Sequence, residues 1–160
     1  MDYLWTPWRY QYITKPEEPG VCVLCAAAQP GDDARSFVVH RAARSYVILN
    51  RYPYTSGHLM VVPYDHVASL GELSGETLTE MILLARDAER HLCAVYRPEG
   101  LNIGMNLGQS AGAGIAAHVH LHVLPRWRGD TNFMTVTGET RVVPEDLETT
   151  WRKLREVWKA

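Results

Sequence analysis

Apolar and polar residues alternate along two segments of the chain, residues 101–106 and 118–125, which is the pattern of β-strands that bury one face. Turn-forming residues separate these segments, and short hairpin connections join neighbouring strands. Three short, mainly apolar runs, residues 37–40, 46–49 and 58–63, predict further strands, which makes five with residues 101–106 and 118–125.

A helical period replaces this alternation between residues 74 and 96, where apolar residues recur every three or four positions. Pro98 and Gly100 end this helix, and an apolar stripe over residues 144–158 predicts a closing helix. Three strands, a long helix, two strands and a last helix favour an antiparallel sheet covered by helices. We therefore expect a single α+β domain over residues 1–160, with about five strands, one long central helix and a C-terminal helix.

The first 20 residues stand apart because they are rich in aromatic side chains without a clear period. We interpret residues 1–20 as an aromatic arm that packs on the body of the domain or on a second subunit. The alternative is that the arm supplies an aromatic wall for an adenine base. The aromatic residues are Tyr3, Trp5, Trp8, Tyr10 and Tyr12.

Composition and charge limit the classes of partner that we expect this protein to bind. Hydrophobic residues make up 46% of the chain and charged residues 21%, as in folded globular proteins. A net charge of −2 gives no general attraction to nucleic acid, so a nucleic acid polymer is not an expected partner. The sequence shows no secretory segment and no apolar run of membrane-spanning length. We expect a cytoplasmic protein that binds a small molecule and no membrane.

The chain has three cysteines, and two of them form a Cys-x-x-Cys pair at Cys22 and Cys25. An odd number argues against a disulfide framework and for a reducing compartment. The pair has the spacing of a zinc half-site on a turn, which needs two further ligands. The alternative is a pair of small buried thiols.

Three histidines alternate with aliphatic residues in the last predicted strand: His118, His120 and His122. The alternation places their imidazoles on one face. Adjacent rings would lie ~6.6 Å apart and the outer two ~13 Å apart, so all three are not expected to bind one metal ion. The favoured interpretation is that one ring is a nucleophile while the others orient it or bind another group. A neutral imidazole attacks phosphorus well near neutral pH.

The loop before the histidines, residues 106–114, contains three glycines and two alanines. Such a loop leaves backbone N–H groups accessible and can cradle an anion. Together, the loop and the histidines suggest a phosphate held against an imidazole.

The His-x-His-x-His segment, its Ala-Gly-Ala-Gly lead-in and its Pro125-Arg126-Trp127 tail resemble the signature of the histidine triad (HIT) family of nucleotide hydrolases and transferases. The likeness covers roughly residues 5–158. Within the family, the chain is similar to bacterial members that resemble diadenosine tetraphosphate phosphorylases. It shares with them a Trp-Thr-Pro-Trp-Arg start, the Cys-x-x-Cys pair, an Asn-x-x-Pro-x-x-x-Gly-His element and a Gly-Asp-x-Asn-Phe element. The resemblance implies the HIT-like fold and a homodimer.

The resemblance also implies catalytic roles. His120 would be the nucleophile, with its other ring nitrogen bonded to a backbone carbonyl, such as that of His118. His122 would hold phosphate oxygens and the charge that develops on them. Three backbone amides would share that task, those of Gly112, Ala113 and Gly114.

Four more residues receive roles from the resemblance, each with a plainer alternative. Asn50 would contact ribose hydroxyls, or cap a turn. Asn106 would donate to the phosphate chain, or cap its loop. His58 would lie against the active site, or be an ordinary histidine at a strand end. Trp127 would shape the mouth of the pocket, or simply pack.

For the Cys-x-x-Cys pair, the resemblance supplies the missing ligands, His66 and His118. A structural zinc ion on Cys22, Cys25, His66 and His118 is therefore expected, with no organic cofactor. Zinc on His118 would leave His120 and His122 for the chemistry.

The expected activity is cleavage of a dinucleoside polyphosphate at its α-phosphate through a nucleotidyl-histidine intermediate. Gly114 lies four residues before His118, where other HIT groups carry Gln or Ser, so the sequence leaves water and inorganic phosphate open as acceptors. Three alternatives also stay open. They are hydrolysis of nucleoside phosphoramidates or other nucleotide conjugates, nucleotide binding without turnover, and a metal-dependent hydrolase with the triad as ligands.

Overall fold

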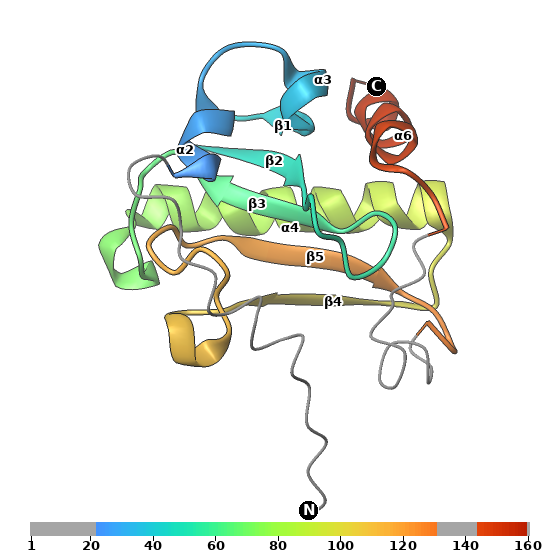
Figure 1. Cartoon of the computed structure of the whole chain (residues 1–160). Helices are drawn as coiled ribbons and strands as arrows, with labels where there is room; N and C mark the ends of the chain where they lie inside the picture. The colour runs from blue at the N-terminus through green and yellow to red at the C-terminus, as the bar shows by residue number, and fades with distance from the viewer. Residues whose placement is uncertain (1–21, 131–143, 160) are drawn as a thin grey trace, which may run out of the picture.

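The computed structural model describes residues 22–130 and 144–159, so the arm of residues 1–20 lies outside the described residues. Five antiparallel strands form one sheet in the order β1-β2-β3-β5-β4 (Figure 1). The predicted α+β architecture is confirmed. The strands are β1 (Val38–Arg41), β2 (Ser45–Leu49), β3 (Leu59–Pro63), β4 (Gly100–Met105) and β5 (Leu121–Arg126). The helices are α2 (Val23–Ala28), α3 (Asp33–Ser36), α4 (Gly75–Tyr96) and α6 (Leu147–Lys159), with 3₁₀ turns η1 (Leu70–Glu72) and η2 (Gln109–Ala111).

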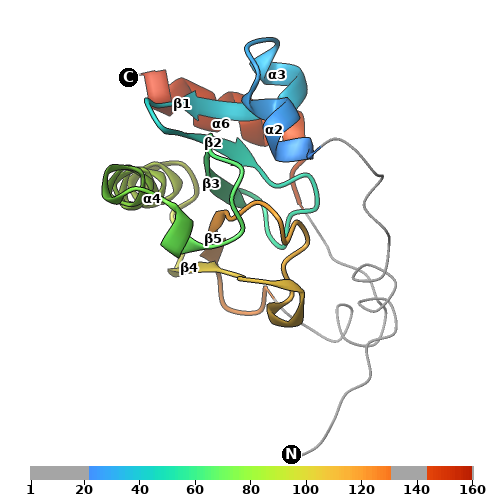
Figure 2. The ribbon, with the colours of Figure 1, turned by 90° about the vertical axis from the view of Figure 1, so that its left-hand side faces the viewer.

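The long helix α4 covers one face of the sheet (Figure 2). Ser74 caps its N-terminus, because the Ser74 side chain accepts a hydrogen bond from the Thr77 backbone N–H at 3.1 Å. The predicted period is confirmed, since one stripe of α4 faces strands β2, β3 and β5. The buried residues of this layer include Val47, Leu59, Val61, Met81, Leu84, Ala88, Leu92, Leu121 and Val123.

The second face of the sheet is covered over β1, β2 and β3 by α2 (Figure 2). Leu24 of α2 is buried in a separate apolar cluster with side chains of those strands: Val38, Tyr46, Ile48, Met60 and Val62. The Tyr46 hydroxyl donates to the Leu24 carbonyl at 2.7 Å, which fixes the helix to the sheet. In the described part of the chain, the β5–β4 end of this face carries no α-helix.

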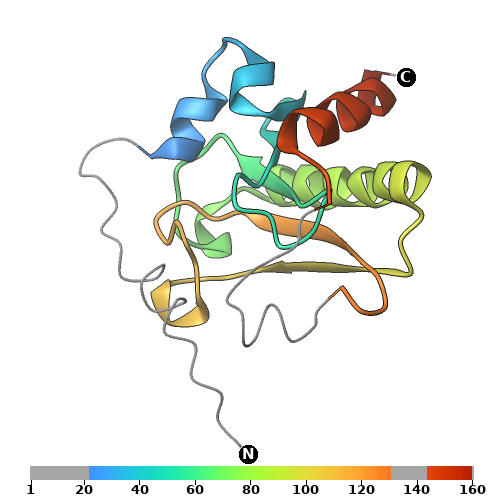
Figure 3. The same cartoon turned by 45° about the vertical axis from the view of Figure 1, so that its right-hand side comes forward.

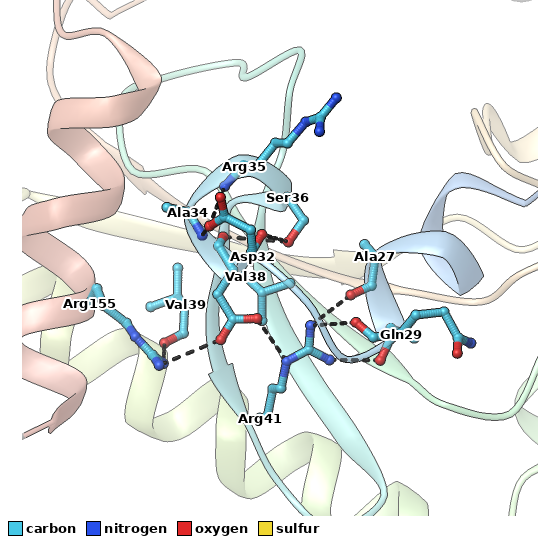
Figure 4. Close-up of polar contacts among 12 residues, drawn as sticks. Ala27, Gln29, Asp32, Ala34, Arg35, Ser36, Val38, Val39, Arg41 and Arg155 are labelled. Carbon is cyan, nitrogen blue, oxygen red and sulfur yellow. Dashed lines mark hydrogen bonds and ion pairs between the residues drawn. The ribbon is translucent and has the colours of Figure 1, made fainter.

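An arginine cluster ties α2 to β1 and α6 (Figure 4). Arg41 donates to Asp33 at 2.9 Å, and Asp33 also pairs with Arg155 of α6 at 3.5 Å. Arg155 donates to the carbonyl of Val39, so α6 is held at the β1 end of the sheet (Figure 3). The same Arg41 guanidinium caps α2, whose last carbonyls lack helical partners. Arg41 donates to the carbonyls of Ala28, Ala27 and Gln29 at 2.7, 2.9 and 3.2 Å.

The histidine segment differs from its predicted boundaries, because β5 begins only at Leu121. The β3–β5 ladder stops at the Val61–Leu121 pair. Pro63, two residues further along β3, has no N–H to continue it. Instead, the carbonyl of Pro63 lies 3.0 Å from His118 Nε2, and the Val119 N–H donates to the Val67 carbonyl at 2.8 Å. The chain therefore approaches β5 outside the sheet, through a turn that the His118 N–H closes by donating to the Ile115 carbonyl at 3.3 Å.

Candidate active site

The three histidines of the triad separate into two neighbouring groups. His118 turns toward the cysteines at the N-terminus of α2, whereas the rings of His120 and His122 lie edge to face, 4.8 Å apart. His58, just before β3, joins the second group with its ring centroid 5.0 Å from that of His122. The structure thus brings His58, His120 and His122 together on the face of the sheet opposite α4.

The tautomer of His120 is fixed by the backbone. Its Nδ1 lies 2.8 Å from the carbonyl oxygen of His118, which can only accept, so Nδ1 carries the proton. Nε2 is then unprotonated. Burial lowers the pKa of His120, and the bond to the His118 carbonyl offsets part of this effect. The result is a neutral imidazole with a lone pair on Nε2, which is the form a nucleophile requires.

A hydrogen-bond chain fixes the tautomer of His122. The Tyr54 backbone N–H donates to His58 Nδ1 at 3.2 Å, which makes Nδ1 of that ring the acceptor. His58 therefore carries its proton on Nε2 and donates it to His122 Nδ1, 2.9 Å away. His122 is left with a proton on Nε2. Burial, followed by the neighbouring charge of His120, lowers the pKa of His122 to about 4, so the ring is a neutral donor at pH 7.

Asn50 stabilises the turn that presents His58. Its side-chain oxygen accepts from the Tyr52 N–H at 2.9 Å, and its side-chain nitrogen lies 3.4 Å from His58 Nδ1. The backbone N–H of Asn50 donates to the carbonyl of His58 at 2.9 Å. Asn50 thus caps the turn and also touches the candidate site. Contact with a ribose stays a prediction.

Tyr54 is a site residue that the sequence analysis missed. Its ring centroid lies 4.8 Å from that of His58 and 6.3 Å from that of His122. An aromatic residue inside the Asn-x-x-Pro-x-x-x-Gly-His element, four positions before its histidine, was the available signal.

Some backbone N–H groups of the small-residue loop already donate hydrogen bonds within the loop. The Gly112 N–H donates to the Gln109 carbonyl at 2.9 Å, and the Ala113 N–H donates to the Gly108 carbonyl at 3.3 Å. The amide of Gly114 has no such partner among the described residues. Of the three amides predicted to hold phosphate, Gly114 is therefore the one that can donate without breaking the turn.

Asn106 and Trp127 lie at opposite ends of β5. Met105 pairs with Leu121, so Asn106 follows β4 beside His120, where its side-chain nitrogen donates to the Gly112 carbonyl at 3.4 Å. Trp127 follows the far end of β5, ~16 Å along the strand from His122. There it packs edge to face on Tyr96, with ring centroids 6.5 Å apart. The structure thus does not bring Trp127 to the histidines.

A candidate metal centre lies beside the histidines. One ligand atom each from Cys22, Cys25, His66 and His118 lies within 4.8 Å of the others. Cys25 Sγ is 3.1 Å from His66 Nδ1 and 3.5 Å from His118 Nδ1, and Cys22 Sγ is 3.4 Å from His118 Nδ1. A tetrahedral zinc ion sets sulfur and nitrogen ligands ~3.5 Å apart, so these separations fit zinc.

The chemistry of the donors also fits a metal. His118 Nε2 lies 3.0 Å from the Pro63 carbonyl, which can only accept, so Nδ1 is deprotonated and faces the thiols. Burial raises the pKa of Cys25, and a hydrogen bond and charge from Cys22 raise it further. Two thiolates at this position therefore need a cation to stabilise them.

Together, the sheet and the alternating histidines define a histidine triad protein. The sequence profile of the HIT domain matches residues 32–129, and the chain belongs to the HIT family. The family resemblance expected from the motif is confirmed.

Two proteins and one crystal structure illustrate what the chain is similar to. The chain is 41% identical to an AP-4-A phosphorylase of Mycobacterium tuberculosis, over 99% of this chain and 85% of that one. It is 32% identical to the asymmetrical bis(5'-nucleosyl)-tetraphosphatase of Schizosaccharomyces pombe, over 59% of this chain and 52% of that one. A crystal structure of a zinc-bound histidine triad family protein from Mycobacterium smegmatis matches with a TM-score of 0.68 and 29% identity, over 86% of this chain and 93% of that one. Within residues 22–130 and 144–159, we find no helix with the length and apolar character needed to span a membrane.

Proposed function

We propose that the protein is a HIT-family nucleotidyl hydrolase or transferase that cleaves dinucleoside polyphosphates at the α-phosphate. The main support for this proposal is the hydrogen bond from His120 Nδ1 to the His118 carbonyl. This bond leaves His120 Nε2 unprotonated, next to the ring of His122, whose Nε2 carries a proton. Full-length similarity to an AP-4-A phosphorylase supports a diadenosine tetraphosphate-like substrate.

In the first step, His120 Nε2 attacks the α-phosphorus. A phosphorus–nitrogen bond forms, and the bond from phosphorus to the bridging oxygen breaks, so the rest of the polyphosphate leaves with that oxygen. His122 Nε2–H and the Gly114 amide donate to the phosphate oxygens as negative charge develops on them. Asn50 and Asn106 lie at the edges of this site and would contact the ribose and the phosphate chain.

In the second step, an acceptor attacks the same phosphorus and the bond to His120 breaks, which restores the neutral imidazole. If inorganic phosphate is the acceptor, the adenylyl group leaves as ADP. If water is the acceptor, it leaves as AMP. Gly114 offers only its backbone amide here, and similarity to the phosphorylase favours phosphate.

Product analysis tests this proposal. The protein is incubated with diadenosine tetraphosphate, with and without inorganic phosphate, and the nucleotides are separated by chromatography. ADP plus ATP that appears only with phosphate would establish phosphorolysis, and AMP plus ATP without phosphate would establish hydrolysis. Products that persist in His120→Ala would rule out His120 as the nucleophile. Tight nucleotide binding without turnover would instead establish a binding module.

We also propose that Cys22, Cys25, His66 and His118 hold a structural zinc ion. Bound zinc supplies a cross-link between the start of α2 and the segment before β5, and takes no part in the transfer. The thiol ligands favour a reducing compartment, such as the cytoplasm. Elemental analysis of protein purified without chelator should give about one zinc per chain, the content of a single closed site.

We propose, finally, that the single domain forms a homodimer through β4. Among the described strands, β4 is the last of the sheet, and Ile103 on it is 49% exposed. Ile82 and Leu83 of α4 add further exposed apolar surface. Light scattering should give twice the chain mass, and Ile103→Lys should return the protein to the monomer mass, whereas a lysine in place of exposed Val23 on α2 should not.

A further inference from the structure

One aromatic residue contacts the hydrogen-bonded pair of His58 and His122 in two ways. The ring of Tyr54 lies against both imidazoles, at 4.8 Å and a 46° interplanar angle to His58 and at 6.3 Å and 28° to His122. The backbone N–H of the same residue donates to His58 Nδ1 at 3.2 Å. The His58–His122 pair therefore contacts the Tyr54 ring through both imidazoles and the His120 ring through that of His122.

We propose that Tyr54 is a positioning residue of the transfer reaction: its ring covers the His58–His122 pair, and its N–H fixes the direction of the hydrogen bond between them. The inference rests on the proposed function. It explains how the proton of His122 stays on Nε2, where the phosphate would bind.

The turn around Tyr54 is built to hold the ring in place. The Asn50 side chain accepts from the Tyr52 N–H at 2.9 Å, and the His58 N–H donates to the Thr55 carbonyl at 3.3 Å. The hydroxyl of Thr55 donates to the Pro125 carbonyl of β5 at 3.0 Å, which ties the turn to the strand that follows His122. These bonds lie on both sides of Tyr54 in the sequence, so they hold the backbone that carries its ring.

The electrostatic surroundings of His122 make its protonation sensitive to the presence of the Tyr54 ring. Among the described residues, the titratable rings that face His122 are those of His120, His58 and Tyr54, and its neighbours across the ladder, Met60 and Gly104, carry no charge. The low pKa of His122 arises first from burial. Without the Tyr54 ring, water reaches the pair and protonation of His122 becomes easier. A protonated His122 Nδ1 can no longer accept from His58, and the hydrogen-bond chain loses its direction.

The test compares Tyr54→Ala with Tyr54→Phe, which keeps the ring, and with Tyr52→Ala on the same turn. Tyr52 is 73% exposed, against 42% for Tyr54. Imidazole nitrogen NMR without substrate reports the pKa and tautomer of each histidine. In Tyr54→Ala, which keeps the backbone N–H but removes the ring, we expect the pKa of His122 to rise by ~1 unit or more. Tyr54→Phe and Tyr52→Ala should match the unmodified protein.

Steady-state kinetics on diadenosine tetraphosphate provide the second readout. We expect kcat of Tyr54→Ala to fall ~10- to 100-fold with little change in KM, the size of effect that follows when a residue orienting the reacting groups is removed. An unchanged pKa of His122, or a loss confined to KM, would overturn the positioning role. If Tyr54→Ala does not fold, Tyr54→Leu serves in its place under the same criteria. Because the NMR arm uses no substrate, it decides the inference even if no variant turns over the nucleotide.

Discussion

The backbone carbonyl of His118 accepts a hydrogen bond from His120 Nδ1 at 2.8 Å, while the His118 side chain faces the thiols of the candidate metal centre. One residue therefore belongs to both groups. Its ring completes the predicted zinc site, and its main chain sets the tautomer of the predicted nucleophile. The two functions therefore meet in one residue, and the contact of His118 Nε2 with the Pro63 carbonyl at 3.0 Å helps to hold that residue in place.

Replacement of the nucleophile should separate turnover from binding. In His120→Ala, we expect kcat on diadenosine tetraphosphate to fall by ~10³-fold or more, because the covalent step has no other unprotonated nitrogen in place. Nucleotide affinity, measured by calorimetry, should change little. His91→Ala, which alters a histidine that packs on Trp158 away from the site, is the matched control. Equal losses of affinity and rate would contradict the assignment.

Removal of the metal should affect stability more than rate. His118 keeps its contact with the Pro63 carbonyl when the metal leaves, so the carbonyl that orients His120 stays close to its position. We expect chelation to lower the melting temperature by roughly 5–10 °C, since each kcal/mol corresponds to ~2–4 °C in a protein of this size. Scanning calorimetry with and without chelator measures this shift.

Two thiol variants complete that test. Cys25→Ser should reproduce the effect of chelation, whereas Cys93→Ser, which alters an exposed thiol on α4, should not. If the protein contains zinc but neither chelator nor Cys25→Ser changes its melting temperature, the site contributes nothing to the stability of the fold.

The sequence predicted the fold well where a repeating pattern decides the structure. The stripe of apolar residues placed α4 within one residue of its observed start, and the apolar runs and alternating segments placed all five strands. The start of β5 was predicted too early, because an alternating pattern does not reveal that the partner strand ends at a proline. The cysteine pair was expected on a turn, but Cys22 caps α2 and Cys25 lies within it. Six residues carry too weak a helical period to be recognised.

Among the candidate site residues, the histidines and Asn50 could be named from the sequence, but the contacts between them could not. His58 was placed near the site because of its motif, but its bond to His122 depends on the register of β3 against β5, with Met60 opposite His122. Tyr54 reaches the same pair through the shape of a turn, which sequence periodicity does not encode. The contacts of Trp127 with Tyr96 likewise depend on how α4 crosses the end of the sheet.

Loss of His58 should impair the reaction through His122. Without the Nε2–H of His58, Nδ1 of His122 has lost its donor, and the neutral ring can place its proton on either nitrogen. We expect His58→Ala to lower kcat by ~10- to 100-fold while leaving the adenylyl acceptor unchanged. The ADP-to-AMP ratio of the products shows whether the adenylyl acceptor is the same in the variant. A rate equal to that of the unmodified protein would mean that the pair has no role in turnover.

Acid should destabilise the folded protein before its carboxylates titrate. The pKa of His122 is about 4 in the folded state and about 6.5 when unfolded, so the unfolded state binds more protons between these values. The stability that the neutral ring contributes is fully present above pH ~6.5 and is lost as the pH falls toward 4, by at most ~1.4 kcal/mol per unit. Burial also lowers the pKa of His40 and His91, which adds to the same slope.

Urea denaturation at pH 7, 6 and 5 measures this slope. His122→Gln should reduce it, because the variant removes one of the buried groups that must take up a proton on unfolding. Stability that is equal at pH 7 and pH 5 would contradict the neutral state of His122 in the folded protein.

The anchoring of α2 predicts that a residue remote from the cysteines controls metal retention. Arg41 caps the C-terminal carbonyls of α2 (Figure 4). Cys22 is the N-cap residue of that helix, and Cys25 lies in its middle. Loss of these charge-assisted bonds should cost ~1.5–3 kcal/mol and let α2 shift over its apolar cluster. We expect Arg41→Ala to release zinc to a competing chelator ~10-fold more readily, because a prebuilt tetrahedral site tolerates little displacement of two ligands. Arg86→Ala on α4, whose ion pair with Asp87 is exposed, should leave metal retention unchanged. If both variants hold zinc equally well, the metal itself orders α2 and the arginine cluster serves only the fold.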